Sequence, residues 1–221
     1  MSKHLERDLE QLQHDILDMG TAVEEAVTRA VRAVLDRDAD LAREVIDGDT
    51  PIDLQENQVE EDCLKILALH QPVAGDLRRI TAVLLINTDL ERMADLAVEM
   101  AERAVELAVP PLIPVPENLP AMSDMATSML KQSLDAFVHL DPKQARRVIR
   151  LDDEVDNYNV EIIDDLIALM KKSPEYVAPG LSLFSVVRHL ERIADHATNI
   201  AEDVVYLVEG EIVRHRPVEQ E

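Results

Sequence analysis

The stretch LERMADLAVEMAERAVEL, residues 90–107, recurs with changes as LERIADHATNIAEDVVYL, residues 190–207. Ten of the 18 positions are identical. Apolar residues recur at steps of three and four in both copies, which is the pattern of an amphipathic helix with one buried face. A chain that contains the same acidic helix twice, 100 residues apart, is predicted to be built from an internal repeat.

A second pair of segments extends the repeat beyond this helix. AREVIDGDTPID at residues 42–53 matches ARRVIRLDDEVD at residues 145–156 at six of 12 positions. The offset between the copies is 103 residues here and 100 in the opening pair. We therefore expect the loop between the second and third helices to be three residues shorter in the second copy. Two copies are too few for a solenoid and instead predict two related units.

Helical periodicity covers nearly the whole chain on both sides of a proline-rich segment. Five of the 12 residues in VPPLIPVPENLP, residues 109–120, are proline, which disfavours a helix and favours an extended linker. Gly48 and Pro51 are expected to kink the second helix. We predict an all-α fold of two pseudo-symmetric three-helix bundles. The six expected helices cover residues 5–34, 39–70, 73–108, 120–139, 142–173 and 179–210. The expected units are a first bundle at 1–108, a linker at 109–120, a second bundle at 121–215 and a tail at 216–221.

The composition fits a helical bundle and restricts the classes of partner. Hydrophobic residues make up 47 % of the chain but aromatic residues only 2 %, so small and branched aliphatic side chains must fill the interior. The formal net charge of −23 argues against nucleic-acid binding and against adsorption to anionic lipid. It permits the binding of cations, or docking on a basic protein surface.

The chain also carries signals of its cellular compartment. Cys63 is the only cysteine, so no disulfide can form within the chain, and its apolar neighbours indicate a buried thiol. The N-terminal segment MSKHLERDLEQLQHDIL lacks the apolar core of a signal peptide. The longest apolar run, AVLLI at residues 82–86, is too short to cross a bilayer. We expect a cytoplasmic protein with no direct membrane insertion.

Four pairs of acidic residues recur in both copies at the i, i+4 spacing that places two carboxylates on one helix face. Like charges at this spacing destabilise a helix by about 0.2–0.5 kcal/mol per pair unless a cation or partner offsets their repulsion. If the second and third helices of each unit are antiparallel neighbours, they bring four carboxylates together, which suits hard cations such as Mg, Ca, Mn or Fe. The candidate metal ligands are Asp49, Asp53, Glu91, Asp95, Asp152, Asp156, Glu191 and Asp195.

A solvated acidic surface is the alternative reading of these pairs. With 45 acidic residues in 221 positions, about nine such pairs arise by chance. Arg92 and Arg192 could bridge the second acid of each recurring pair, and exposed bridges contribute little stability. Retention of all four pairs across the repeat favours a cation site. His196 lies beside Asp195 and is a candidate neighbouring ligand in the second copy alone, because its counterpart is Leu96.

No recognisable catalytic site is present in the sequence. A ferritin-like di-metal enzyme needs Glu-x-x-His on two helices, and none of the seven histidines has Glu three positions before it. The chain also lacks a glycine-rich phosphate loop, a cysteine pair for zinc and a nucleophile elbow. We therefore predict a protein that acts by binding and is not an enzyme.

Several segments resemble the PhoU family of phosphate-transport accessory and regulatory proteins. The resemblance is carried by AREVIDGDTPID, QPVAGDLRRI, LERMADLAVEM and LERIADHATNIAED. It extends from the first helix to VEGEIVRH at residues 208–215. The second-half segment is the most specific part of the match.

The resemblance implies a fold, a pathway and a set of partners. The fold would be two three-helix bundles related by a pseudo-twofold axis. The protein would be an adaptor between the ATPase of the phosphate ABC importer and a sensor histidine kinase, restraining uptake and the starvation response when phosphate is plentiful. Some members bind multinuclear metal clusters through an E/D-x-x-x-D spacing, and the eight candidate acidic residues match that spacing. The resemblance therefore implies bound Fe, Mn, Mg, Ca or Zn ions. None of these ions is expected to be required for the fold. We also expect a homodimer.

The chain departs from the family pattern at two related positions. The family often has Gly before the Asp of the motif, where this chain has Ala94 and Ala194, so packing or metal access could differ. The two expected metal sites need not be equal, because the first copy has Leu96 and Glu99 where the second has His196 and Asn199. The alternative function is a helical bundle that binds or stores metal.

Overall fold

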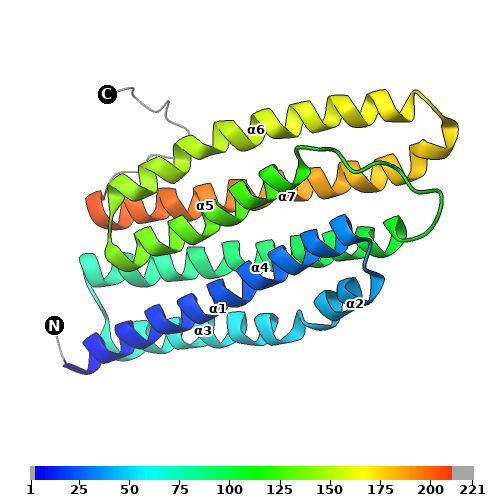
Figure 1. Ribbon diagram of the computed structural model, residues 1–221. Helices are drawn as coiled ribbons and strands as arrows, with labels where there is room; N and C mark the ends of the chain where they lie inside the picture. The colour runs from blue at the N-terminus through cyan, green and yellow to red at the C-terminus, as the bar shows by residue number, and fades with distance from the viewer. Residues whose placement is uncertain (1–2, 211–221) are drawn as a thin grey trace.

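The computed structural model describes residues 3–210, and within them every regular element is helical. Figure 1 shows long helices that run side by side, with both described ends of the chain at the same end of the molecule. The α-helices are α1 (Lys3–Asp36), α2 (Ala39–Asp47), α3 (Thr50–His70), α4 (Gly75–Leu107), α5 (Leu119–His139), α6 (Pro142–Met170) and α7 (Val177–Glu209), and a short 3-10 helix, η1 (Pro174–Tyr176), precedes α7. Residues 211–215 of the expected second unit and the expected tail at 216–221 lie outside the described residues.

The six predicted helices are present, and the predicted kink in the second helix is a complete break. Gly48 ends α2 by donating its backbone N–H to the carbonyl oxygens of Glu44 and Val45. Pro51 lies in the first turn of α3, where a missing backbone donor is tolerated. The second predicted helix is therefore the pair α2 and α3.

Each half of the chain forms a three-helix bundle, and the two bundles meet at α4 and α7. In the first half, α1 packs against α3 and α4, and in the second, α5 packs against α6 and α7. Contacts between α4 and α7 pair Asp89 with His196 and Glu106 with Ser182. Residue numbers rise on one helix as they fall on the other, so α4 and α7 are antiparallel. This arrangement confirms the predicted pseudo-symmetric fold.

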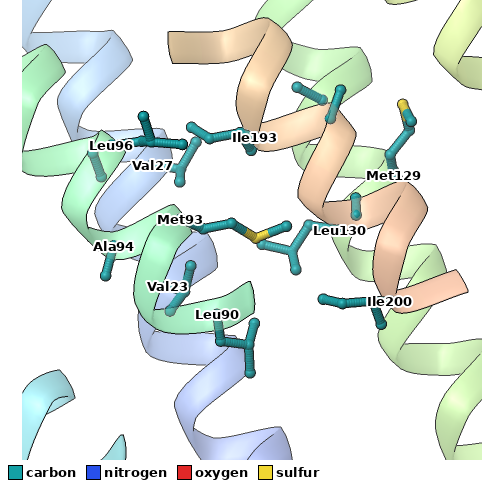
Figure 2. Packing of buried hydrophobic residues seen from close by; sticks show 14 of the residues in the cluster. Val23, Val27, Leu90, Met93, Ala94, Leu96, Met129, Leu130, Ile193 and Ile200 are labelled. Carbon is teal, nitrogen blue, oxygen red and sulfur yellow. The ribbon is translucent and has the colours of Figure 1, made fainter. Parts of the chain in front are cut away.

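One hydrophobic core runs through both bundles. Figure 2 shows Met93 of α4 pointing across the interface toward Leu130 of α5, with Val27 of α1 and Ile193 of α7 nearby. All four side chains are completely buried. Cys63 is also buried, as predicted, and burial raises the pKa of its thiol to about 12. The two sequence repeats therefore share one interior.

The expectation of a shorter second loop is wrong. The connection between α3 and α4 is residues 71–74, whereas residues 171–176 connect α6 to α7. Ser173 is extended, with φ of −152°, and Pro174 begins η1, so α6 ends at Met170. Relative to the repeat, α6 ends three residues earlier than α3 and α7 begins two residues later than α4, so the second copy is shorter in its helices and not in its loop.

Arg37 anchors the proline-rich segment to the first bundle. Its guanidinium donates to the carbonyl oxygen of Leu107 at 3.1 Å and also to that of Ile113, whose side chain is buried. These two bonds connect Arg37 to the last residue of α4 and to the middle of the proline-rich segment that follows it. The segment is therefore packed against the helices.

Arg37→Ala is expected to lower the free energy of unfolding by about 1–3 kcal/mol, because it leaves two partly buried carbonyl oxygens without their donor. Urea denaturation measures the loss. Arg43→Ala is the control, since Arg43 pairs with Asp40 where both side chains are exposed, and its effect should stay within about 0.5 kcal/mol. Equal losses for the two variants would contradict an anchoring role for Arg37.

Candidate functional site

Two groups of carboxylates lie between neighbouring helices, one group in each bundle. The first carboxylate cluster lies between α3 and α4, and the second carboxylate cluster lies between α6 and α7. Of the four predicted pairs, Asp49/Asp53 and Asp152/Asp156 lie on α3 (Asp49 at its N-cap) and on α6, and Glu91/Asp95 and Glu191/Asp195 lie on α4 and α7. The first cluster comprises Asp49, Asp53, Glu56, Glu91 and Asp95, and the second comprises Asp152, Asp156, Glu191 and Asp195.

In the first carboxylate cluster, acids of α3 and α4 repel one another across the helix pair. Burial raises the pKa of Asp49, and the charges of Asp53 and Asp95 raise it further. Burial also raises the pKa of Glu91, followed by the charge of Asp95. Arg92 partly offsets this repulsion, because its guanidinium lies 3.5 Å from Glu91 and 3.6 Å from Asp95.

The second carboxylate cluster is more strongly coupled. Burial and the charges of Asp195 and Asp156 raise the pKa of Asp152 to about 6, although the Thr198 hydroxyl donates to this carboxylate at 3.3 Å. Burial likewise raises the pKa of Asp195, and the charge of Asp156 adds to it. The structure thus brings the predicted acids of α6 and α7 so close together that the charge on one helix raises the pKa of a carboxyl group on the other.

Glu191 differs from its repeat counterpart Glu91 in its cation partner. Arg188 donates to Glu191 Oε1 at 2.7 Å, whereas position 88 in the first copy is Thr. The other carboxylate oxygen, Oε2, is buried and has no hydrogen-bond partner. The burial of Glu191 raises its pKa. The two clusters therefore have different charge balances in spite of the shared motif.

The sequence analysis missed Glu56, whose pKa burial raises together with the charges of Glu60 and Asp53. Glu56 lies three residues after Asp53 on α3 and so belongs to the same helix face. Its counterpart in the second copy is Asn159, so a search restricted to acids retained in both copies could not find it. Spacing along α3 was the only signal available.

The donor set fits a hard cation, although the side chains do not form a complete coordination shell. All nine groups are carboxylates, which are the ligands that Mg, Ca and Mn prefer. The unpartnered Glu191 Oε2 offers a free acceptor inside the second carboxylate cluster. Among the described residues, however, no three His, Cys, Asp or Glu side chains are arranged to hold a metal ion. A cation would require some of the more exposed carboxylates to rotate toward it.

His196, the candidate neighbouring ligand, has a partner on the other bundle. Its Nδ1 lies 2.7 Å from Asp89 Oδ1, which also accepts from the Asn199 amide at 3.3 Å. The pseudo-twofold relates the Asp89–Asn199 contact to one between His189 and Glu99, in which His189 Nδ1 lies 3.3 Å from a carboxylate oxygen of Glu99. Both histidines thus lie in the polar seam between α4 and α7.

Asp152→Asn is expected to stabilise the metal-free protein at pH 8. The folded pKa of about 6 exceeds the ordinary value of 3.8, so folding favours the protonated form. That contribution is fully present below pH 3.8 and is lost as the pH rises through about 6. Removing the charge should raise the free energy of unfolding by about 1–2 kcal/mol at pH 8, after allowance for solvent screening. The gain should shrink by pH 4.5.

Denaturation in a chelating buffer at both pH values measures this difference. Asp165→Asn is the matched control, because Asp165 is exposed on the same helix, and its effect on stability should stay within about 0.5 kcal/mol. A loss of stability in Asp152→Asn that is the same at both pH values would instead assign the carboxylate a structural hydrogen bond with Thr198.

Known proteins are similar in sequence to this chain over nearly its whole length. The PhoU domain matches residues 16–104 and 119–204, one match for each bundle. The phosphate-specific transport system accessory protein PhoU homolog of Aquifex aeolicus is 39 % identical over 214 residues, covering 97 % of each chain. The homolog of the same name from Deinococcus radiodurans is 39 % identical over 210 residues, covering 95 % of this chain and 99 % of that protein.

Solved structures share the fold over almost their entire length. PhoU from Pseudomonas aeruginosa superposes with a TM-score of 0.88 at 35 % identity, covering 93 % of this chain and 99 % of that one. The phosphate transport system regulatory protein PhoU from Streptococcus pneumoniae gives a TM-score of 0.89 at 30 % identity, covering 95 % and 99 %.

Proposed function

The chain belongs to the PhoU family, and from that membership we propose that it regulates phosphate uptake and phosphate-starvation signalling. The full-length similarity to proteins named as phosphate transport accessory and regulatory proteins is the observation that carries this proposal. Similarity over both bundles matters because the shared core makes them one structural unit.

The proposed role is that of a cytoplasmic adaptor. It contacts the ATPase of the phosphate ABC importer and a sensor histidine kinase, and restrains both when phosphate is plentiful. Within residues 3–210, none of the helices is apolar over a length that would span a bilayer. The net charge of −23 supports docking on basic protein surfaces. A homodimer would present two copies of each surface.

Regulation in this proposal proceeds by binding, without catalytic turnover. Support comes from the sequence, which contains no nucleophile elbow, phosphate loop or Glu-x-x-His motif. The carboxylate clusters would hold divalent or iron cations, whose positive charge would neutralise the buried repulsion between α3 and α4 and between α6 and α7. Metal storage is the second candidate function, and the two clusters are the observation that favours it.

Affinity capture from phosphate-replete cells tests the adaptor role. The tagged protein is expected to retain the transporter ATPase and a histidine kinase, identified by mass spectrometry. Retention should fall as ionic strength rises from about 0.05 to 0.5 M, because salt screens exposed charges. Enrichment of neither partner would overturn the adaptor proposal. A deletion strain altered only in metal tolerance would favour storage.

A further inference from the structure

Two asparagines, one in each bundle, have buried amide oxygens that accept no hydrogen bond. Asn87 of α4 is 2 % exposed and Asn159 of α6 is 6 % exposed, and Oδ1 of each lacks a partner. The Asn87 amide nitrogen donates to the backbone carbonyl of Glu56 at 3.0 Å, so this side chain lies between α3 and α4. An unpaired buried amide oxygen lowers the stability of the fold unless something binds it.

Both asparagines lie on the helix faces that carry the carboxylate clusters. Asn87 is four residues before Glu91, one turn along the same face of α4. Asn159 is three residues after Asp156, on the face of α6 that meets α7. Each asparagine therefore lies within one helical turn of its carboxylate cluster, and its amide oxygen is buried. We call these buried positions the inner ends of the clusters.

Each bundle has one such asparagine at the same height along its helix pair. The helix that carries the asparagine differs between the two bundles. Asn159 corresponds to Glu56 at the offset of 103, and Asn87 corresponds to Val187 at the offset of 100. The hydrogen bond from Asn87 to Glu56 establishes that these two positions face each other. The first bundle thus supplies its amide from α4, and the second supplies its amide from α6.

In the second bundle a carboxylate oxygen is unpartnered at this same level. Ion pairing of Arg146 with Glu209 and the hydrogen bond between Thr198 and Asp152 show that α6 and α7 are antiparallel. Asn159 therefore lies near the level of Glu191, whose buried Oε2 has no donor. Two acceptor oxygens cannot satisfy each other, so this position calls for a positively charged or hydrogen-donating occupant.

We infer that each carboxylate cluster has an inner cation-binding position at which a buried asparagine, Asn87 or Asn159, supplies a neutral amide oxygen. The ligand is a hard divalent cation of the Mg, Mn or Ca class, which accepts amide and carboxylate oxygens and retains bound water. This inference rests on the proposed cation binding and adds to it a ligand that the acidic motif does not contain. It also explains why an otherwise unpaired amide is buried at one level in both bundles.

Mn²⁺ titration of the metal-free protein, followed by calorimetry and by the electron paramagnetic resonance signal of free Mn²⁺, tests the inference. Asn159→Val, which installs the residue found at position 187, should weaken Mn²⁺ binding in the second bundle about tenfold. The same change should leave the metal-free melting temperature equal or higher, because an unpaired polar group is removed. Asn159→Asp should tighten binding and lower the metal-free melting temperature.

Asn157→Val is the matched control, because Asn157 is exposed on the same helix and should leave Mn²⁺ affinity unchanged. Unchanged affinity in both Asn159→Val and Asn87→Val would overturn the inner position while leaving cation binding by the carboxylates intact. Loss of metal-free stability in Asn159→Val with unchanged affinity would overturn it too, and assign the amide to a buried water. A wild type that binds no Mn²⁺ would overturn both proposals about cations, whereas the phosphate-signalling role is tested separately in cells.

Discussion

Saturating Mn²⁺ is expected to raise the melting temperature of the metal-free protein by about 5–10 °C for each carboxylate cluster that it occupies. A ligand at 100 times its dissociation constant stabilises the folded state by about 2.7 kcal/mol when it does not bind the unfolded chain. For a chain of 221 residues, each kcal/mol corresponds to about 2–4 °C. Differential scanning calorimetry in chelator and in Mn²⁺ measures the shift.

The double change Glu191→Gln with Asp195→Asn should remove most of the response of the second bundle. It should also raise the metal-free melting temperature slightly, because the charge of Asp195 raises the pKa of both Glu191 and Asp152. Glu6→Gln with Glu10→Gln is the matched control, an exposed i, i+4 acidic pair on α1 far along the chain from either cluster. If the wild type did not respond to Mn²⁺ and the double variant were less stable without metal, the acids would be structural partners of Arg188 and its neighbours.

Met93→Ala is expected to destabilise both bundles together. Met93 is completely buried and points into the core between α4, α5 and α7 (Figure 2). Truncating such a side chain costs about 2–5 kcal/mol, because apolar contacts are lost and a cavity remains. Since both repeats line this core, the melting temperature should fall with one cooperative transition.

Hydrogen exchange resolved by peptide distinguishes one cooperative unit from two. Peptides from α3 and from α6 should lose protection to the same extent in Met93→Ala, although α6 belongs to the other repeat. Val160→Ala, at an exposed position of α6, is the control and should change stability by less than about 0.5 kcal/mol. Loss of protection confined to residues before the proline-rich segment would show that the bundles unfold independently.

The helices and their pairing were accessible from sequence because each depends on local periodicity and on a repeat visible within one chain. The break at Gly48 was predicted only as a kink, since the strength of a helix end depends on the cap bonds that form around it. The contact of His196 with Asp89 could not be predicted from the sequence, because Asp89 is more than 100 residues away and belongs to the other bundle.

The spacing of acidic residues in the sequence predicted the carboxylate clusters, but it did not predict the buried asparagines beside them. Asn87 and Asn159 occupy positions that do not correspond in the repeat, so comparison of the two copies passes over both. Only the three-dimensional packing shows that the two amides lie at the same level of their bundles. Residues that act across a helix interface are therefore missed when each helix is read separately.

Expression of a phosphate-starvation reporter in phosphate-replete cells tests the central claim most directly. Deleting the gene for this chain should switch the reporter on at high phosphate, and restoring the wild-type gene should switch it off again. A Met93→Ala gene of lowered stability should restore it only in part, in proportion to the folded protein present. A reporter that stays off at high phosphate in the deletion strain would contradict the account of this chain as a regulator of phosphate signalling.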